Sequence, residues 1–281
     1  MSEVVFARTR HEYDSYADFW DLVAHSAFSV CFVDEIDVAR DCIYITTPIN
    51  GDTFPHLDNE LAAKPKRSRL VWWNMERHDA PGAQPLAEAL TEVMQRFDAA
   101  WTSDRMIAAR DARLTFAVMG SVAALRQDEP PPHTEYDFCH YSYACPRRAP
   151  LYARCRQVGL SEAPGAWTRD DRDRMLKRAR IMLNAQQHPE AVTAPLRFAI
   201  AAAYSLPIVS ETISDPYPLE VGRHMVQAPF QDLPGVIADL LRQPERLAAM
   251  GAAVHETLCR EWPFRRGVAE AVRASLGEEI A

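Results

Sequence analysis

Two residues of opposite charge stand at positions that suit the binding of a phosphorylated ligand. Arg197 lies in the helix-like stretch TAPLRFAIAAAYSLP, and Ser210 and Glu211 end the apolar segment IVSE. An arginine in the first turn of a helix adds to the helix dipole and can hold a diphosphate by paired hydrogen bonds. A carboxylate at the end of the next strand can accept the hydroxyl groups of a ribose or another sugar. An ion pair between the two side chains is the alternative, and spacing alone leaves both open.

The segments around these residues have the patterns of a helix followed by a buried strand. Thr193 suits the N-cap of the helix, Pro195 suits its first turn, and Pro207 ends it. The short apolar run 208–211 then predicts a strand of a parallel sheet. Ligands of open parallel sheets bind beyond the carboxyl ends of the strands, where helix N-termini also point. Both charged residues are therefore expected at one sheet edge.

A second group of polar residues follows two predicted strands in the first half of the chain. One part is a turn after the apolar segment that begins at Cys42, and the other follows the strand 69–75. At a carboxyl sheet edge such groups can orient a hydroxyl group or remove its proton. A plain turn and solvated loop charges explain the same residues without any chemistry. The candidates are Asn50, Gly51, Asp52, Asn74, Glu76, His78 and Asp79.

Short apolar runs alternate with amphipathic stretches along the whole chain. Strands are predicted at 4–8, 28–36, 42–47 and 69–75, and helices at 15–27 and 85–97. Pro130, Pro131 and Pro132 cannot enter a helix or a central strand, so we expect a domain boundary there. After it the alternation resumes with a strand at 136–144. This pattern predicts an α/β protein with two Rossmann-like parallel-sheet domains, residues 1–132 and 133–260.

Composition excludes several classes of protein. The 281 residues are 48% hydrophobic and 25% charged, which is typical of folded domains rather than disordered chains. The formal net charge is −8, which argues against a non-specific nucleic-acid coat. No apolar run approaches the ~18–20 residues that cross a bilayer, so no membrane insertion is expected. The polar opening segment does not resemble a secretory signal. A cytoplasmic protein is the expectation.

Metal-binding and cofactor motifs are missing from the sequence. The six cysteines form no CxxC pair, which favours small buried thiols in a reducing compartment. Asp170, Asp171 and Asp173 begin a helix-like stretch, where acidic residues stabilise the helix dipole, with metal binding as the alternative. Neither half opens with GxGxxG, which disfavours a dinucleotide-dependent oxidoreductase. We therefore expect neither a metal ion nor a cofactor.

The order of several segments resembles the donor-binding half of GT-B glycosyltransferases, in particular the group 1 and CgeB-like relatives. The matching features are a strand that ends in Leu-Asn, an alanine-rich helix with an arginine, a small-Pro-apolar strand that ends in Ser-Glu, and a late LLxxPER helix. The opening of the same domain and one strand of the first half also match. These segments are IMLNAQ, LRFAIAAAYSLPIVSE, FQDLPGVIADLLRQPERLAAM, YDFCHYSYACPRRAPLYARCRQVGL and LVWWNMER.

This resemblance implies two parallel-sheet domains that face a cleft, with residues 261–281 crossing back to the first domain. It implies transfer of a sugar from a nucleotide-sugar donor to an acceptor hydroxyl, without a metal ion and with retention at the sugar. The second domain would bind the donor through Asn184, Arg197, Ser210, Glu211, His188, Tyr143, Arg147 and Arg148. The first domain would bind the acceptor through Asn50, Gly51, Asp52 and Asn74, with Glu76, His78 and Asp79 as catalytic groups.

The chain departs from the family pattern at three positions. Retaining relatives carry two glutamates where this chain has Val192 and Ile200, and a glycine where it has Ser205. The two missing glutamates favour an alternative function, a non-catalytic nucleotide-binding or nucleotide-sugar-binding module or regulator of the same fold. As acceptors we expect a glycan, a small molecule or a hydroxylated DNA base. A DNA acceptor would require a basic rim, for which the one dense cluster is Lys64, Lys66, Arg67 and Arg69.

Overall fold

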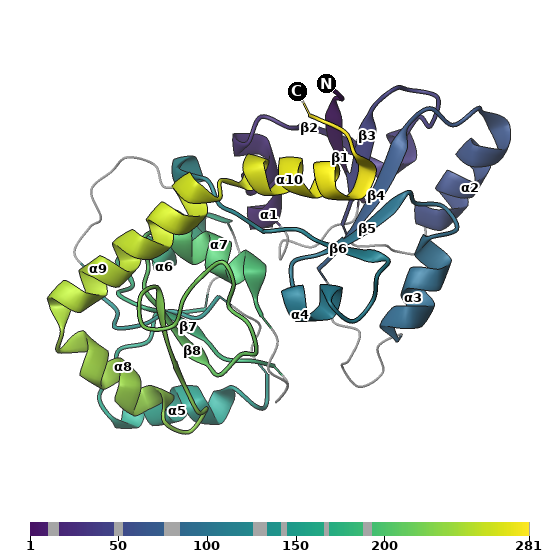
Figure 1. Cartoon of the computed structure of the whole chain (residues 1–281). Helices are drawn as coiled ribbons and strands as arrows, with labels where there is room; N and C mark the ends of the chain where they lie inside the picture. The colour runs from purple at the N-terminus through teal and green to yellow at the C-terminus, as the bar shows by residue number, and fades with distance from the viewer. Residues whose placement is uncertain are drawn as a thin grey trace. The chain divides into compact units, whose positions relative to one another are not determined.

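The computed structural model describes residues 1–10, 17–47, 53–75, 85–125, 134–141, 145–165, 169–187 and 193–280. Its internal contacts divide the chain into two compact units (Figure 1). Unit 1 comprises Met1–Val118 together with Arg265–Ala281, and unit 2 comprises Met119–Phe264. Each unit is built around a parallel sheet, as the alternating pattern predicts. The predicted boundary at the three prolines falls outside the described residues.

Unit 1 contains a six-stranded parallel sheet of order β2-β1-β3-β4-β5-β6. The strands are β1 (Val4–Arg8), β2 (Ser29–Phe32), β3 (Ile43–Thr46), β4 (Arg69–Asn74), β5 (Ala99–Thr102) and β6 (Leu114–Phe116). The helices are α1 (Ala17–His25), α2 (Thr53–Ala63), α3 (Leu86–Val93) and α4 (Arg105–Ala108), with most of α10 (Phe264–Leu276). The 3-10 turns are η2 (Val33–Glu35) and, in unit 2, η3 (Ala123–Leu125).

Both faces of the sheet are buried at β4, whose successive residues point to opposite sides. Trp72 packs on one face with Leu57 of α2 and Leu90 of α3. Trp73 lies on the other face, with its ring 5.7 Å from Trp101 and 5.8 Å from Phe19 of α1. The two tryptophans are therefore core residues on opposite faces, which confirms the strand prediction.

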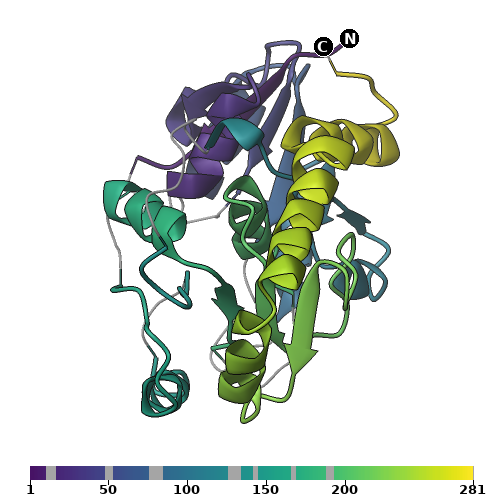
Figure 2. The same cartoon turned by 90° about the vertical axis from the view of Figure 1, so that its left-hand side faces the viewer.

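Helix α10 joins unit 1 although its sequence follows unit 2. Trp101 Nε1 donates a hydrogen bond of 3.0 Å to Ser275 Oγ, and Arg265 Nη1 donates one of 3.2 Å to Ser26 O. A bridge between Ser2 and Ile280 brings the two ends of the chain together, and both views show them side by side (Figures 1 and 2). Unit 1 is thus assembled from two segments that are far apart in sequence.

Unit 2 contains a three-stranded parallel sheet of order β7-β8-β9. The strands are β7 (Met182–Asn184), β8 (Ile208–Glu211) and β9 (Met225–Ala228). The helices are α5 (Ala149–Gln157), α6 (Arg169–Arg178), α7 (Pro195–Ala203), α8 (Leu233–Leu241) and α9 (Pro244–His255), followed by the π-helical turn η4 (Glu256–Glu261). Residues 212–224 connect β8 to β9 without a helix.

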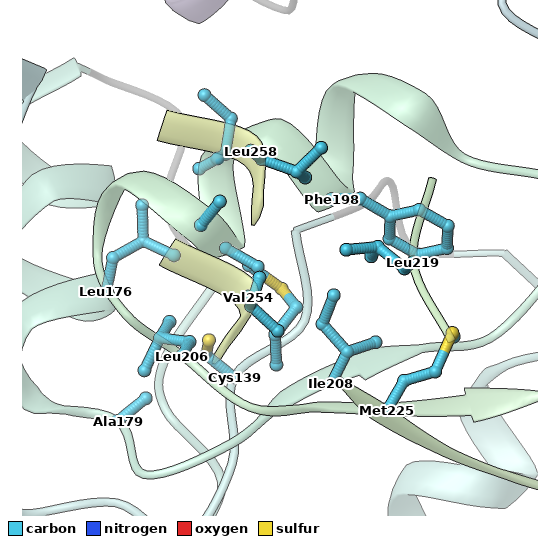
Figure 3. Packing of buried hydrophobic residues seen from close by; sticks show 14 of the residues in the cluster. Cys139, Leu176, Ala179, Phe198, Leu206, Ile208, Leu219, Met225, Val254 and Leu258 are labelled. Atoms are coloured by element: carbon cyan, nitrogen blue, oxygen red, sulfur yellow. The ribbon is translucent and has the colours of Figure 1, made fainter. Parts of the chain in front are cut away.

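The core of unit 2 surrounds the buried helix α7. Phe198 of α7 packs in one cluster with Ile208 of β8 and Val254 of α9 (Figure 3). The alanines of α7 are also buried, which lets neighbouring elements approach the helix closely. Since α7 is held by packing on all sides, the backbone that carries Arg197 in its first turn is held in place.

Three local predictions need correction. The strand expected at 28–36 ends at Phe32, because Glu35 accepts the Phe32 N–H and closes the turn η2. In the described part of the segment 136–144 the structure has isolated bridges, such as Cys139 with Met182, rather than a regular strand. Pro244 divides the long helix expected after residue 232 into α8 and α9. Among the described helices, none is long and apolar enough to span a membrane.

Candidate functional site

The candidate site lies at the carboxyl edge of the sheet in unit 2. Asn184 is the last residue of β7 and Glu211 is the last residue of β8, and both are buried. Tyr141 follows the bridge between Cys139 and Met182 at the same edge. Helix α7 begins beside it, with Arg197 in its first turn. In parallel α/β sheets this edge is where ligands bind.

Four of the predicted donor-binding residues form one connected network at this edge. Arg197 Nη1 donates to Asn184 Oδ1, and Arg197 Nε donates to Tyr141 O at 2.9 Å. Asn184 Nδ2 donates to Ser210 Oγ at 2.8 Å, and Ser210 Oγ donates to the Glu211 carbonyl at 2.6 Å. The helix start and the strand end are therefore linked through two neutral side chains.

A second set of contacts fixes the Glu211 carboxylate. Arg147 forms a two-pronged ion pair with it, with Nη1 2.9 Å from Oε2 and Nη2 bonded to Oε1. Arg147 Nη1 also donates to Gln186 O at 2.9 Å, and the Gln186 N–H donates to Glu211 Oε2 at 3.0 Å. The Arg147 guanidinium lies over the Phe230 ring, 4.2 Å from its centroid. The alternative of an Arg197–Glu211 ion pair is therefore wrong, because Glu211 pairs with Arg147.

Positive charge is concentrated here. Arg148 is buried, and its Nε donates to Ala185 O at 2.8 Å. Burial, and next the charge of Arg148, lower the pKa of Arg197 to about 10. This pKa is still far above neutral, so the Arg197 guanidinium is charged at pH 7. Within the described residues no carboxylate contacts Arg197, whose partners are a carbonyl and an amide oxygen. An anion beside it would stabilise its charge.

A half-buried histidine lies near these arginines. His140 Nε2 is 3.1 Å from Glu162 Oε1, and the His140 ring stacks on Tyr152 with centroids 4.1 Å apart. Burial lowers the pKa of His140, the Glu162 carboxylate opposes this shift, and the charges of Arg148 and Arg197 add to it. Glu162 also pairs with Arg156, so its charge is already balanced.

In unit 1 the carboxyl edge of the sheet carries buried polar side chains. Asn74, a predicted acceptor-binding residue, ends β4 and pairs in register with Thr102 of β5. Asn74 is 3% exposed, and Thr46 at the end of β3 is 1% exposed. Among the residues that the structure describes, the Thr46 hydroxyl has no hydrogen-bond partner. This edge therefore places polar groups where the acceptor was expected.

The remaining predicted residues are placed as follows. Arg147 and Arg148 join Asn184, Arg197, Ser210 and Glu211 at one edge. The candidates outside the described residues are Asn50, Gly51, Asp52, Glu76, His78, Asp79, Tyr143 and His188. Across the described ranges, no group of three or more His, Cys, Asp or Glu residues is arranged to hold a metal ion.

The basic cluster does not form a free rim. It precedes or begins β4, so it lies at the amino edge of the sheet, at the opposite end of the strand from Asn74. Each of its side chains faces a carboxylate: Lys64 with Asp37 and Glu60, Lys66 with Asp98, Arg67 with Asp41, and Arg69 with Glu278. This cluster therefore does not supply the basic rim that a DNA acceptor would require at the other edge.

Sequence reasoning missed two contributors to the site. Phe230 is the last residue of the strand that the sequence predicts at 224–230, and Gln186 contributes its backbone N–H and carbonyl. Because almost every residue type has a backbone N–H and carbonyl, the sequence gives no signal for a contribution from backbone atoms. The signal for Phe230 is its place at the carboxyl end of a predicted strand, directly before a helical segment, where side chains can face the sheet edge.

Comparisons with known proteins place the fold. No protein-family model and no curated protein sequence matches the chain. HepE from Anabaena, solved with UDP-glucose, has a TM-score of 0.63 and 12% identity over 98% of this chain and 100% of its own. AviGT4, a glycosyltransferase involved in avilamycin A biosynthesis, has a TM-score of 0.53 and 12% identity over 99% and 98%. TarM has a TM-score of 0.57 and 12% identity over 86% and 56%, so this chain spans about half of TarM.

The fold is that of GT-B glycosyltransferases. The parallel-sheet architecture predicted from the sequence is thereby confirmed, since these structures match nearly the whole chain. The match does not distinguish the predicted CgeB-like relatives from other proteins of this fold. That assignment still rests on the sequence segments alone.

Proposed function

We propose that the protein is a glycosyltransferase that moves a sugar from a nucleotide-sugar donor to an acceptor hydroxyl. The shared fold supports this proposal, because HepE adopts it with UDP-glucose bound. The connected polar network at the carboxyl edge of unit 2 supports it as well. In this proposal the edge binds the nucleoside diphosphate part of the donor.

The observation that carries the proposal is the charge of Arg197. Its guanidinium is held by neutral oxygens beside the like charge of Arg148, in an environment that lowers its pKa. A diphosphate at this edge would supply the missing negative charge. It would also be released as the leaving group, so the same arginines would stabilise the charge that develops during transfer. This role requires no metal ion.

The acceptor would bind at the carboxyl edge of unit 1. Asn74 would orient the acceptor hydroxyl, with Asn50, Gly51 and Asp52 as further binding groups. Glu76, His78 and Asp79 would supply the group that receives its proton. Net retention at the sugar follows from the family resemblance. Because the basic cluster is paired and lies at the other edge, we favour a glycan or a small molecule over a DNA base.

The test is ligand-induced stabilisation. The melting temperature is measured with ADP, GDP, UDP and CDP and with nucleotide sugars such as UDP-glucose. A ligand at one hundred times its Kd adds about 2.7 kcal/mol to the free energy of unfolding. A positive ligand is then incubated with candidate acceptors, and sugar transfer is followed by mass spectrometry. If no diphosphate or nucleotide sugar raises the melting temperature at millimolar concentration, the proposal fails.

A pair of arginine variants makes this test specific. Arg197→Met should weaken diphosphate binding about 10- to 100-fold, because it removes charge-assisted hydrogen bonds. Arg180→Met is the matched control, since Arg180 precedes β7 at the opposite edge and donates to Leu241 O. The control variant should bind like the unaltered protein. Equal losses in both variants would point to general destabilisation instead.

One observation favours the second candidate, a nucleotide-binding module without transferase activity. Ile200, which replaces a glutamate of the retaining relatives, is 1% exposed and packs in the core of unit 2. The sugar-binding role of that glutamate would need another residue. A module of this kind would bind a nucleoside diphosphate with the expected affinity. It would release no free sugar from the donor and transfer none, which a hydrolysis assay detects.

A further inference from the structure

Arg147 directs its guanidinium end toward the Glu211 carboxylate rather than toward solvent. Its two terminal nitrogens each bond one carboxylate oxygen, and one of them also bonds Gln186 O. The Phe230 ring covers the guanidinium plane at 4.2 Å. The Arg147 side chain is 24% exposed and that of Glu211 is 11% exposed. Three kinds of contact thus hold the pair in a single geometry.

The contacts on Glu211 also limit what it can still bind. An ionised carboxylate offers about four lone-pair positions. Oε2 accepts two hydrogen bonds, from Arg147 and from the Gln186 N–H, and Oε1 accepts one from Arg147. One position on Oε1 is left without a donor among the described residues. The carboxylate can therefore accept one hydroxyl group of a ligand without losing any of its present partners.

We propose that Arg147 is a positioning residue, which aims Oε1 of Glu211 at a single ribose hydroxyl of the nucleotide. This inference rests on the proposed function, because it assumes that the sheet edge binds a ribonucleotide. It differs from the expectation that Arg147 itself binds the donor. Arg147 keeps two N–H groups, on Nε and Nη2, that these contacts do not use, so a direct phosphate contact is the alternative that the experiment must separate.

The experiment compares a ribonucleoside diphosphate with its 2′-deoxy and 3′-deoxy forms. The base is the one with the largest thermal shift among ADP, GDP, UDP and CDP, and Kd is measured by titration calorimetry. The unaltered protein should prefer the ribonucleotide over one of the two deoxy forms about 10- to 100-fold, the effect of one hydrogen bond to a charged group. Glu211→Gln should reduce this preference to about threefold or less.

Arg147→Met should reduce the preference for the ribonucleotide as much as Glu211→Gln does. The methionine keeps the apolar contact with Phe230 but removes the guanidinium group that orients Glu211. The double variant Arg147→Met, Glu211→Gln should show no further reduction. Arg154→Met is the matched control: Arg154 lies over the same ring at 5.8 Å and donates to Phe230 O, and it has no contact with Glu211. Its preference should equal that of the unaltered protein.

The outcomes separate the two proposals. If Arg147→Met weakens the ribonucleotide and both deoxy forms by the same factor, Arg147 acts on the phosphates and the inference is overturned. If the unaltered protein binds a nucleoside diphosphate without preferring its ribose form, the single-hydroxyl role of Glu211 is overturned. If no nucleoside diphosphate binds at all, the proposed function fails instead. Circular dichroism of each variant verifies that it is folded.

Discussion

Asn184 links the helix and strand parts of the site through both atoms of its side-chain amide. Its Oδ1 accepts from Arg197 and its Nδ2 donates to Ser210, and the residue is fully buried. In the part of the chain that the structure describes, this arrangement leaves the Arg197 charge without a negative partner of its own. A residue that is neutral at this position therefore keeps the guanidinium available for an anionic ligand.

Asn184→Asp tests this account at the residue level. The new carboxylate would pair with Arg197 inside the protein and compete with the diphosphate for its charge. We expect affinity for the nucleoside diphosphate to fall at least tenfold, measured by calorimetry, while the melting temperature without ligand falls far less than for Arg197→Met. Unchanged affinity in Asn184→Asp would show that the charge of Arg197 does not bind the phosphates.

His224 predicts a pH dependence of stability. It is fully buried, with Nδ1 accepting the Glu220 N–H at 2.8 Å and Nε2 3.0 Å from Thr257 Oγ1. Burial and the nearby Arg223 lower the pKa of His224, against the weaker opposing effect of Glu220 and Glu261. The unfolded chain then binds a proton more readily than the folded protein, so stability is full above about pH 6.5 and decreases as pH falls.

The measurement is urea unfolding at pH 7, 6 and 5. Between pH 7 and a pH below both pKa values, the free energy of unfolding of the unaltered protein should fall by about 1.4 kcal/mol for each unit by which folding lowers the pKa of His224. Losses from other groups add to this. His224→Gln removes this titration, so its free energy of unfolding should change less between pH 7 and pH 5. Parallel pH profiles for the two proteins would contradict this role of His224.

At the level of elements, the sequence predicted what depends on local patterns. The strands β1 and β4 and the helix α7 follow directly from continuous apolar runs and from Pro195 and Pro207. The pairing of Arg147 with Glu211 could not be predicted, because it joins residues 64 positions apart through the packing of α5. The segment 136–144 has apolar strand character, yet its described part forms only single bridges, because its backbone hydrogen bonds are divided between residues 178–183 and residues 161–163.

Two glycines in helices of unit 2 give a matched test of packing. Gly251 in α9 faces the turn before β8, where an added Cβ would lie 2.2 Å from Ser205 O. Gly235 in α8 has nothing within 4 Å of such a Cβ. Gly251→Ala should therefore destabilise by about 1–3 kcal/mol, whereas Gly235→Ala should stabilise by up to about 1 kcal/mol. Thermal unfolding of the two variants measures both, and equal shifts would contradict this packing.

At the level of the whole molecule, a net charge of −8 and the paired basic cluster predict weak interaction with DNA. Lys66→Ala combined with Arg67→Ala should leave any sugar transfer unchanged and lower stability by about 0–1 kcal/mol for each ion pair. The checks are the transfer assay and fluorescence anisotropy with duplex DNA at low salt. A loss of transfer confined to a DNA acceptor would restore the DNA base as a candidate.

The division into units has a consequence for synthesis on the ribosome. Unit 2 is one uninterrupted stretch, so all of its residues are available before the helix α10 of unit 1 has emerged. Until then the Trp101 indole N–H lacks its acceptor, because the Ser275 hydroxyl lies on α10. Although domains are usually completed in the order in which they are translated, here the unit that is started first is finished last. During that interval the Trp101 indole lacks its partner on α10, and transiently exposed apolar surface of this kind is what makes chaperones necessary.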